Sequence, residues 1–258
     1  REAQGRYLPV LDLAGKVDLD ALMSQTRVLL QLLSPEFVGS LSQSAEASGQ
    51  DLNAAIVAER KTEFGDIVVA GRGRSRYQAR EFAVLFELGG DDVYANAQAT
   101  PIWGSIPSAL IVDFAGDDAY ETHAPFTQGC GDMGVGILAD LSGDDSYVGM
   151  KYTQGAGFCG VGMLIDRSGN DTYRGLQMHQ GIGHWGLGAL LDESGNDRYE
   201  AHCCSQGVGL PGGIGIIRDM GAGADSYYCK GDQASGYGTA GVFEGWGQGV
   251  GFGYRPYA

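Results

Sequence analysis

Apolar residues alternate with glycine and polar residues along most of the chain, and the pattern recurs about every 26 residues. Each repeat contains an acidic residue, a glycine- and aspartate-rich turn and a tyrosine. The six copies occupy residues 87–94, 113–120, 140–147, 166–173, 192–199 and 219–227, and their tyrosines are separated by 26, 27, 26, 26 and 28 residues. This period predicts one coil of a β-solenoid, because a propeller blade needs roughly 40 to 50 residues.

Two further phrases complete each coil and favour strands over helices. A glutamine-glycine phrase begins at Gln128, Gln154, Gln180 and Gln206, and an apolar strand phrase follows it at residues 134–138, 160–164, 186–190 and 213–217. Glycine at every second or third position costs about 1 kcal/mol each in a helix, and no coil shows helical apolar spacing. We therefore predict a mainly β protein, a parallel β-solenoid of about 26–27 residues per coil, with equivalent residues stacked about 4.7–4.9 Å apart.

The strand before each aspartate is apolar on both faces. Leu138, Leu164, Leu190 and Ile217 share one face, whereas Val135, Ile137, Val161, Met163, Ile214 and Ile216 share the other. A strand of this kind is covered on both sides. Residues 17–33 have helical apolar spacing and are followed by Ser34-Pro35, so we expect either this helix or a partner protein to cover the outer face.

The segment before the repeats predicts a cap for the solenoid. We expect a second short helix at residues 51–62 and a first strand at residues 66–71. Residues 1–64 then form a helical N-terminal cap, which the end of a solenoid requires, and residues 65–258 form the repeat domain.

Composition and charge limit the classes of molecule that we expect the protein to bind. The chain has 17 Lys and Arg against 32 Asp and Glu, a net charge of −15, and 44 of its 258 residues are glycine. Such a surface repels nucleic acid and anionic lipid, and no apolar run is long enough to span a bilayer. Cations are the expected small partners. The chain begins at Arg1, which indicates either a removed leader or a piece of a longer protein, and we expect an extracellular, cell-surface or periplasmic location.

The acidic turns are the main candidate chemistry. Stacked carboxylates about 4.8 Å apart repel one another by about 1 kcal/mol per pair in water and more when buried. Either divalent cations neutralise the columns, or each side chain caps its own turn through bonds to backbone N–H groups. The candidate metal ligands are Asp113, Asp117, Asp118, Asp140, Asp144, Asp145, Asp166, Asn170, Asp171, Asp192, Asn196, Asp197, Asp219 and Asp225.

These turns resemble the calcium-binding β-rolls of secreted RTX proteins. The resemblance rests on the Gly-Asp/Asn-Asp-x-Tyr phrases at residues 116–120, 143–147, 169–173 and 195–199. It implies that turn carboxylates and carbonyls from successive turns hold calcium, which takes six to eight oxygen ligands. The RTX motif recurs about every nine residues, whereas here it occurs once per coil, so the resemblance covers the turns and not the whole coil.

Other motifs carry weaker signals. Residues 155–160 match the dinucleotide fingerprint, as do the equivalent residues of three other coils, but no coil leaves room for the helix that the fingerprint needs. The basic run at residues 71–76 is either a phosphate or acidic-partner site or a solvated edge. Cys203 and Cys229 lie in adjacent coils, where we weigh a disulfide against buried free thiols.

The sequence predicts an exported structural or protein-interaction module that binds calcium in its aspartate turns. A carbohydrate-binding or carbohydrate-active β-helix and an accessory subunit of a larger assembly are the alternatives. A catalytic centre should break the repeat, and Lys151, Arg174, His179, His184 and His202 do so in neighbouring coils. No pair of carboxylates stands out for glycoside hydrolysis, so a non-enzymatic role is favoured while catalysis stays open.

Overall fold

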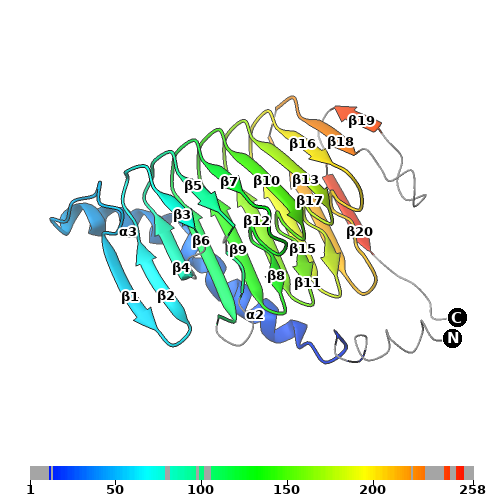
Figure 1. Cartoon of the computed structure of the whole chain (residues 1–258), viewed down its shortest axis with the longest axis horizontal. Coiled ribbons are helices and arrows are strands. Elements are labelled where there is room, and N and C mark those ends of the chain that lie inside the picture. The colour runs from blue at the N-terminus through cyan, green and yellow to red at the C-terminus, as the bar shows by residue number, and fades with distance from the viewer. Residues whose placement is uncertain are drawn as a thin grey trace, which may run out of the picture.

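The computed structural model describes residues 12, 14–78, 82–96, 99–101, 106–221 and 223–229, together with the backbones of residues 241–244 and 248–252. It is a parallel β-solenoid with helices along one side (Figure 1), which confirms the predicted fold class. Three sheets form the walls. We call them sheets A, B and C, with nine, eight and three strands in the described part of the chain.

Sheet A contains the apolar strands that precede the acidic turns. Its repeat strands are β2 (Gly65–Val69), β4 (Phe82–Glu87), β6 (Ser108–Asp113), β9 (Val135–Asp140), β12 (Val161–Asp166), β15 (Leu187–Asp192) and β17 (Ile214–Asp219). Neighbouring strands are parallel and in register, so Asp140, Asp166 and Asp192 are direct partners. The repeat therefore becomes a set of side-chain ladders.

Sheet B contains the tyrosine strands, and sheet C contains the short strands after the glutamines. Sheet B is formed by β3 (Arg76–Gln78), β5 (Val93–Ala95), β7 (Ala119–Glu121), β10 (Ser146–Lys151), β13 (Thr172–Gln177), β16 (Arg198–Ala201) and β18 (Ser226–Cys229). Sheet C is formed by β8 (Gly131–Asp132), β11 (Gly157–Phe158) and β14 (Gly183–His184).

Antiparallel strands close three ends of the large sheets. At the N-terminal end of sheet A, β1 (Ala58–Thr62) pairs with β2. At the C-terminal end, β20 (Gln248–Phe252) pairs with β17, and β19 (Gly241–Glu244) pairs with β18. The all-parallel pattern thus changes where the repeat ends.

The interior is filled by a tyrosine ladder facing a leucine ladder. Tyr94, Tyr120, Tyr147, Tyr173 and Tyr199 are fully buried, and consecutive rings from Tyr77 to Tyr227 stack with centroids 4.6–4.9 Å apart. Leu138, Leu164, Leu190 and Ile217 pack in the same core. The predicted inward face of sheet A is confirmed.

Glutamines fix the corner between sheets B and C. The Gln154 amide donates from Nε2 to the carbonyl of Tyr147 at 3.0 Å and to that of Arg174, in the next coil, at 2.8 Å. Gln154 itself has a left-handed φ of 54°, and the side-chain bonds stabilise this strained backbone. Each glutamine therefore joins its own coil to the following one.

Two helices cover the outer face of sheet A. They are α2 (Leu19–Leu30), which continues as the 3-10 helix η1 (Gln31–Leu33), and α3 (Pro35–Ala47). In Figure 1, α2 runs across the strands of sheet A. Leu33 and other helix residues pack against Val135, Ile137 and Val161. This confirms the chain's own helix as the cover of β9 and β12, whereas Ile214 of β17, which was predicted on the same face, is 39% exposed.

The predicted second helix at residues 51–62 is wrong. The helix is α3, and residues 58–62 form β1. Ser34-Pro35 not only ends the first helix but also starts the second, because Ser34 Oγ accepts the Phe37 N–H at 3.3 Å and Pro35 stands at the first helical position. In β1, Glu59, Arg60 and Lys61 are exposed, which suits an edge strand that avoids further pairing.

Candidate cation sites in the acidic turns

Two columns of buried carboxyl groups run along the solenoid where sheet A turns into sheet B. The strand-end column contains Glu87, Asp113, Asp140, Asp166, Asp192 and Asp219. The turn column contains Asp92, Asp118, Asp145, Asp171, Asp197 and Asp225. All twelve side chains are at most 6% exposed, and among the described residues no ion pair reaches them.

The turn column is held by backbone hydrogen bonds between coils. Asp171 Oδ1 accepts the N–H of Asp145 at 2.7 Å, and the N–H of Asp171 donates to Asp197 Oδ1 at 2.8 Å. The same bond joins each described pair of neighbouring turns. One oxygen of every turn aspartate is therefore committed to the adjacent coil.

The strand-end column is held by tyrosines and by local turn bonds. Tyr147 donates to Asp166 Oδ2 at 2.7 Å, and Tyr120 donates to Asp140 Oδ2 at 2.6 Å. Asp140 Oδ1 accepts the N–H of Ser142 at 3.1 Å, two residues further along. The turn-capping interpretation is thus fulfilled in part, but it does not account for every oxygen.

The remaining oxygens lack a hydrogen-bond donor although they are buried. They are Glu87 Oε1, Asp92 Oδ2, Asp118 Oδ2, Asp145 Oδ2, Asp166 Oδ1, Asp171 Oδ2, Asp192 Oδ1 and Asp197 Oδ2. A buried polar atom without a partner costs roughly 1 to 3 kcal/mol, and more when it is charged. Either a proton or a cation is needed between the two columns.

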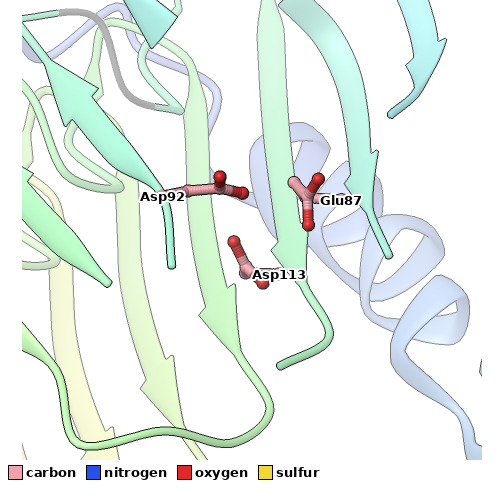
Figure 2. Close-up of side chains that lie close together, drawn as sticks. All are labelled: Glu87, Asp92 and Asp113. Carbon is pink, nitrogen blue, oxygen red and sulfur yellow. The ribbon is translucent and has the colours of Figure 1, made fainter. Parts of the chain in front are cut away.

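The carboxyl oxygens gather in five groups with all ligand atoms of a group within 4.8 Å of one another. The groups are Glu87, Asp92, Asp113; Asp113, Asp118, Asp140; Asp145, Asp166, Asp171; Asp171, Asp192, Asp197; and Asp197, Asp219, Asp225. Figure 2 shows the first group, in which the three carboxyl groups converge on a common space between the end of β4, the end of β6 and the turn that precedes β5. Groups of this composition can hold a metal ion.

Burial makes the ionised form of these groups costly. It raises the pKa of Asp171 to about 10, and the Asp166 carboxyl adds to the increase. It also raises the pKa of Asp145 to about 8 and that of Asp166 to about 6, where the hydrogen bond from Tyr147 offsets part of the effect. Asp145 and Asp171 therefore retain their protons near neutral pH unless a positive charge replaces them, whereas Asp166 loses its proton more readily.

Four predicted ligands lie apart from these groups. Asp117, Asp144, Asn170 and Asn196 are exposed and form a second ladder on the outside of the turns. Asn196 Nδ2 donates to Asn170 Oδ1 at 2.8 Å, and Asp144 Oδ1 accepts the N–H of Asn170 at 2.8 Å. The structure therefore brings ten of the fourteen predicted ligands together and leaves these four in hydrogen bonds to one another and to the backbone.

Sequence reasoning missed Glu87 and Asp92. Both belong to the first copy of the repeat, whose strand-end residue is a glutamate instead of an aspartate. The Gly-Asp-Asp-x-Tyr phrase at residues 90–94 was the signal that could have included them. They form the first of the five groups.

The chain matches no protein-family model, no curated protein and no solved structure. The resemblance to RTX turns therefore rests on the parallel β-solenoid and its aspartate-rich groups. None of the described helices has the length and apolar character of a membrane-spanning segment.

The disulfide that was weighed against buried thiols is not formed. None of the five cysteines is in a disulfide, and the register places Cys229 beside Ala201, two residues before Cys203. Cys203 lies four residues after the ladder tyrosine Tyr199, whereas Cys229 lies only two residues after Tyr227, so the two cysteines are not register partners. Cys203 is buried.

Of the five residues that break the repeat, Lys151 and His202 line one hollow on the outside of sheet B, and the other three lie apart from one another. Arg174 is paired with Glu200 at 3.0 Å on the outside of sheet B. His179 is fully buried in the interior, and His184 Nδ1 contacts the Tyr152 hydroxyl at 2.8 Å at the corner of sheet C. In the basic run, Arg72 is paired with Glu46 at 2.7 Å.

Proposed function

We propose that the protein is an exported structural or interaction module whose acidic turns bind calcium. The observation that carries the proposal is the pair of buried carboxyl columns whose inward oxygens have no donor. Two ionised carboxylates per coil carry two negative charges, which one divalent cation balances. Calcium is the favoured ion because it prefers oxygen ligands and tolerates irregular geometry.

Calcium would supply cohesion between coils and no chemistry of its own. The groups join residues of adjacent coils, for example Asp145 and Asp171, so an ion held there links one coil to the next. Extracellular modules bind calcium with dissociation constants of about 10⁻⁴ to 10⁻³ M. An affinity in this range would fit an exported protein.

Thermal unfolding with and without calcium tests the proposal. At 100 times its dissociation constant a ligand adds about 2.7 kcal/mol to the free energy of unfolding, which for a chain of this size corresponds to a rise of roughly 5 to 10 °C in melting temperature. We expect this rise when excess calcium replaces EDTA. Equal melting temperatures in the two buffers would contradict the proposal.

Two variants locate the ion. Asp171→Asn changes a buried residue that belongs to two groups, so it should reduce the calcium-dependent rise. Asp144→Asn is the matched control, because it removes the same charge from the exposed ladder, where asparagine already occupies positions 170 and 196. A larger loss in Asp144→Asn than in Asp171→Asn would place the ion outside the buried columns.

The two alternative functions gain less support. The accessory-subunit hypothesis relied on an uncovered apolar face, and the chain's own helices pack on that face. The carbohydrate hypothesis requires non-repeating aromatic side chains along an open groove. Phe126, Tyr152, Phe158, His184 and Trp185 do break the repeat, but they pack on one another at the corner of sheet C.

A further inference from the structure

A small hollow lies on the outer face of sheet B, away from the acidic turns. Its volume is about 390 Å³, and it is lined by Met150, Lys151, Leu176, Gln177 and His202. This volume is within the range of about 300–1,000 Å³ that small-molecule sites occupy. The lining residues come from β10, β13 and the segment after β16.

The hollow has an apolar floor that the repeat does not explain. Met150 and Leu176 occupy equivalent positions in neighbouring coils, between the register pairs Gly149–Gly175 and Lys151–Gln177. Their side chains are 39% and 48% exposed. Exposed methionine and leucine side by side on a strand surface leave apolar area in water, which a ligand with an apolar body would cover.

The rim carries a positive charge without a carboxylate partner. Lys151 is exposed, and its ammonium lies 5.5 Å from the centre of the Tyr152 ring. Within the described part of the chain it forms no ion pair.

One carboxylate on the same face is already paired with basic side chains. Glu200 binds Arg174 through Oε2 at 3.0 Å and Arg198 through Oε1. Two guanidinium groups thus bind the carboxylate of Glu200. The amide of Gln177 and the imidazole of His202 add hydrogen-bonding groups to the lining of the hollow.

We propose that this hollow binds a small carboxylate with an apolar body. The apolar body would lie on Met150 and Leu176, and the carboxylate would meet Lys151 with Gln177 and His202 beside it. The site does not depend on calcium, because none of the five acidic groups includes these residues.

A matched set of ligands tests the proposal on the intact protein. The probes are hexanoate, hexanol and hexylamine, which share an apolar chain and carry a negative, a neutral and a positive head group. The readout is the methyl shift of Met150 in methyl-labelled protein, with the exposed Met133 methyl as an internal control. We expect saturable shifts of Met150 with hexanoate, at least tenfold weaker binding of hexanol and no binding of hexylamine.

Two variants test the contributions of the Lys151 charge and of the apolar floor separately. Lys151→Met keeps the aliphatic stem and removes the charge, so the preference for hexanoate over hexanol should disappear. Leu176→Asn should weaken both ligands at least fivefold. Lys61→Met, an exposed change on β1, is the control and should bind as the unmodified protein does.

Three outcomes would each overturn the proposal. The first is the absence of a Met150 shift with hexanoate at tens of millimolar, and the second is an equal affinity for hexanoate and hexylamine. The third is a Lys151→Met variant that still prefers hexanoate over hexanol. Melting temperatures of both variants near that of the unmodified protein would show that lost binding does not reflect lost folding.

Discussion

Each tyrosine of the interior ladder makes two kinds of contact. Tyr173 stacks between Tyr147 and Tyr199 at centroid distances of 4.8 Å, and its hydroxyl donates to Asp192 Oδ2 at 2.8 Å. Tyr77 stands at the end of the ladder, stacks on Tyr94 alone and is 9% exposed. The two positions thus differ in how much packing a truncation removes.

We expect Tyr173→Ala to reduce the free energy of unfolding by about 3 to 5 kcal/mol, as for other buried aromatic residues, and Tyr77→Ala to reduce it less. Tyr173→Phe should keep the stack and lose only the hydroxyl bond, at a cost of about 1 to 3 kcal/mol. Urea unfolding measures all three variants. Equal losses for Tyr173→Ala and Tyr77→Ala would show that stacking on two neighbours adds nothing.

The buried His179 should make the stability of the protein sensitive to acid. Burial lowers the pKa of His179 to about 3, and no charged group is among the causes of the shift. The folded-state pKa lies below the unfolded value of about 6.5, so its contribution to stability is present above pH 6.5 and is lost as the pH falls towards 3.

Replacing His179 by Thr, the residue at the equivalent position 153, should remove this loss. Between pH 7 and 4.5 the unmodified protein should lose about 2 to 3 kcal/mol more than the variant. Urea unfolding at the two pH values measures the difference, and the carboxyl groups shared by both proteins cancel in it. An equal loss of unfolding free energy in the unmodified protein and in the His179→Thr variant would contradict a buried histidine that stays neutral.

The sequence predicted which residues repeat but not which of two adjacent aspartates is buried. Asp144 is exposed, whereas Asp145 is 3% exposed and belongs to the buried turn column. Both are aspartates in one tight turn, and the backbone path through the turn decides which side chain points inward. Composition and spacing carry no information on that path, so the candidate ligands were predicted as one set.

At the scale of elements, the helices and the outer face of sheet A pack against each other through a second apolar layer, separate from the interior of the solenoid. Leu33 is 4% exposed within it, beside Phe86, Leu110 and Val135. Val28 belongs to α2 and is 63% exposed. The two residues lie five positions apart and provide a matched comparison.

We expect Leu33→Asp to loosen the helices, because an unpaired charge in an apolar layer is strongly disfavoured. The change should increase the fluorescence of a hydrophobic dye and promote aggregation. Val28→Asp should have neither effect. Dye binding and light scattering measure both variants, and a soluble, dye-negative Leu33→Asp protein would show that the helix contact is dispensable.

The helical spacing of residues 17–33 was sufficient to predict α2, but the apolar strands of sheet A indicated only that either this helix or a partner protein covers them. The second helix was misplaced because residues 51–62 contain alanine and charged residues that suit a helix in isolation. Residues 58–62 instead pair with the open edge of β2. An edge that needs a partner is a property of the assembled sheet, so it overrides local propensity.

At the scale of the whole molecule, the period of the repeat was sufficient to predict the architecture. A coil can bury its tyrosine and leucine only against another coil, so identical phrases at a fixed spacing require stacking. The antiparallel strands β1, β19 and β20 were not predicted, because they lie where the repeat ends. Their sequences contain no phrase that marks their partner.

The in-register stacking has a mechanical consequence. Nearly all backbone hydrogen bonds between strands join a coil to its two neighbouring coils, so a force applied along the stack between β2 and β18 opens one seam between coils at a time. Each released coil of about 26 residues should lengthen the chain by about 90 Å at most. Single-molecule pulling should therefore give a sawtooth of evenly spaced, low-force steps, and the calcium that we propose for the turns should raise the force of each step without changing its length.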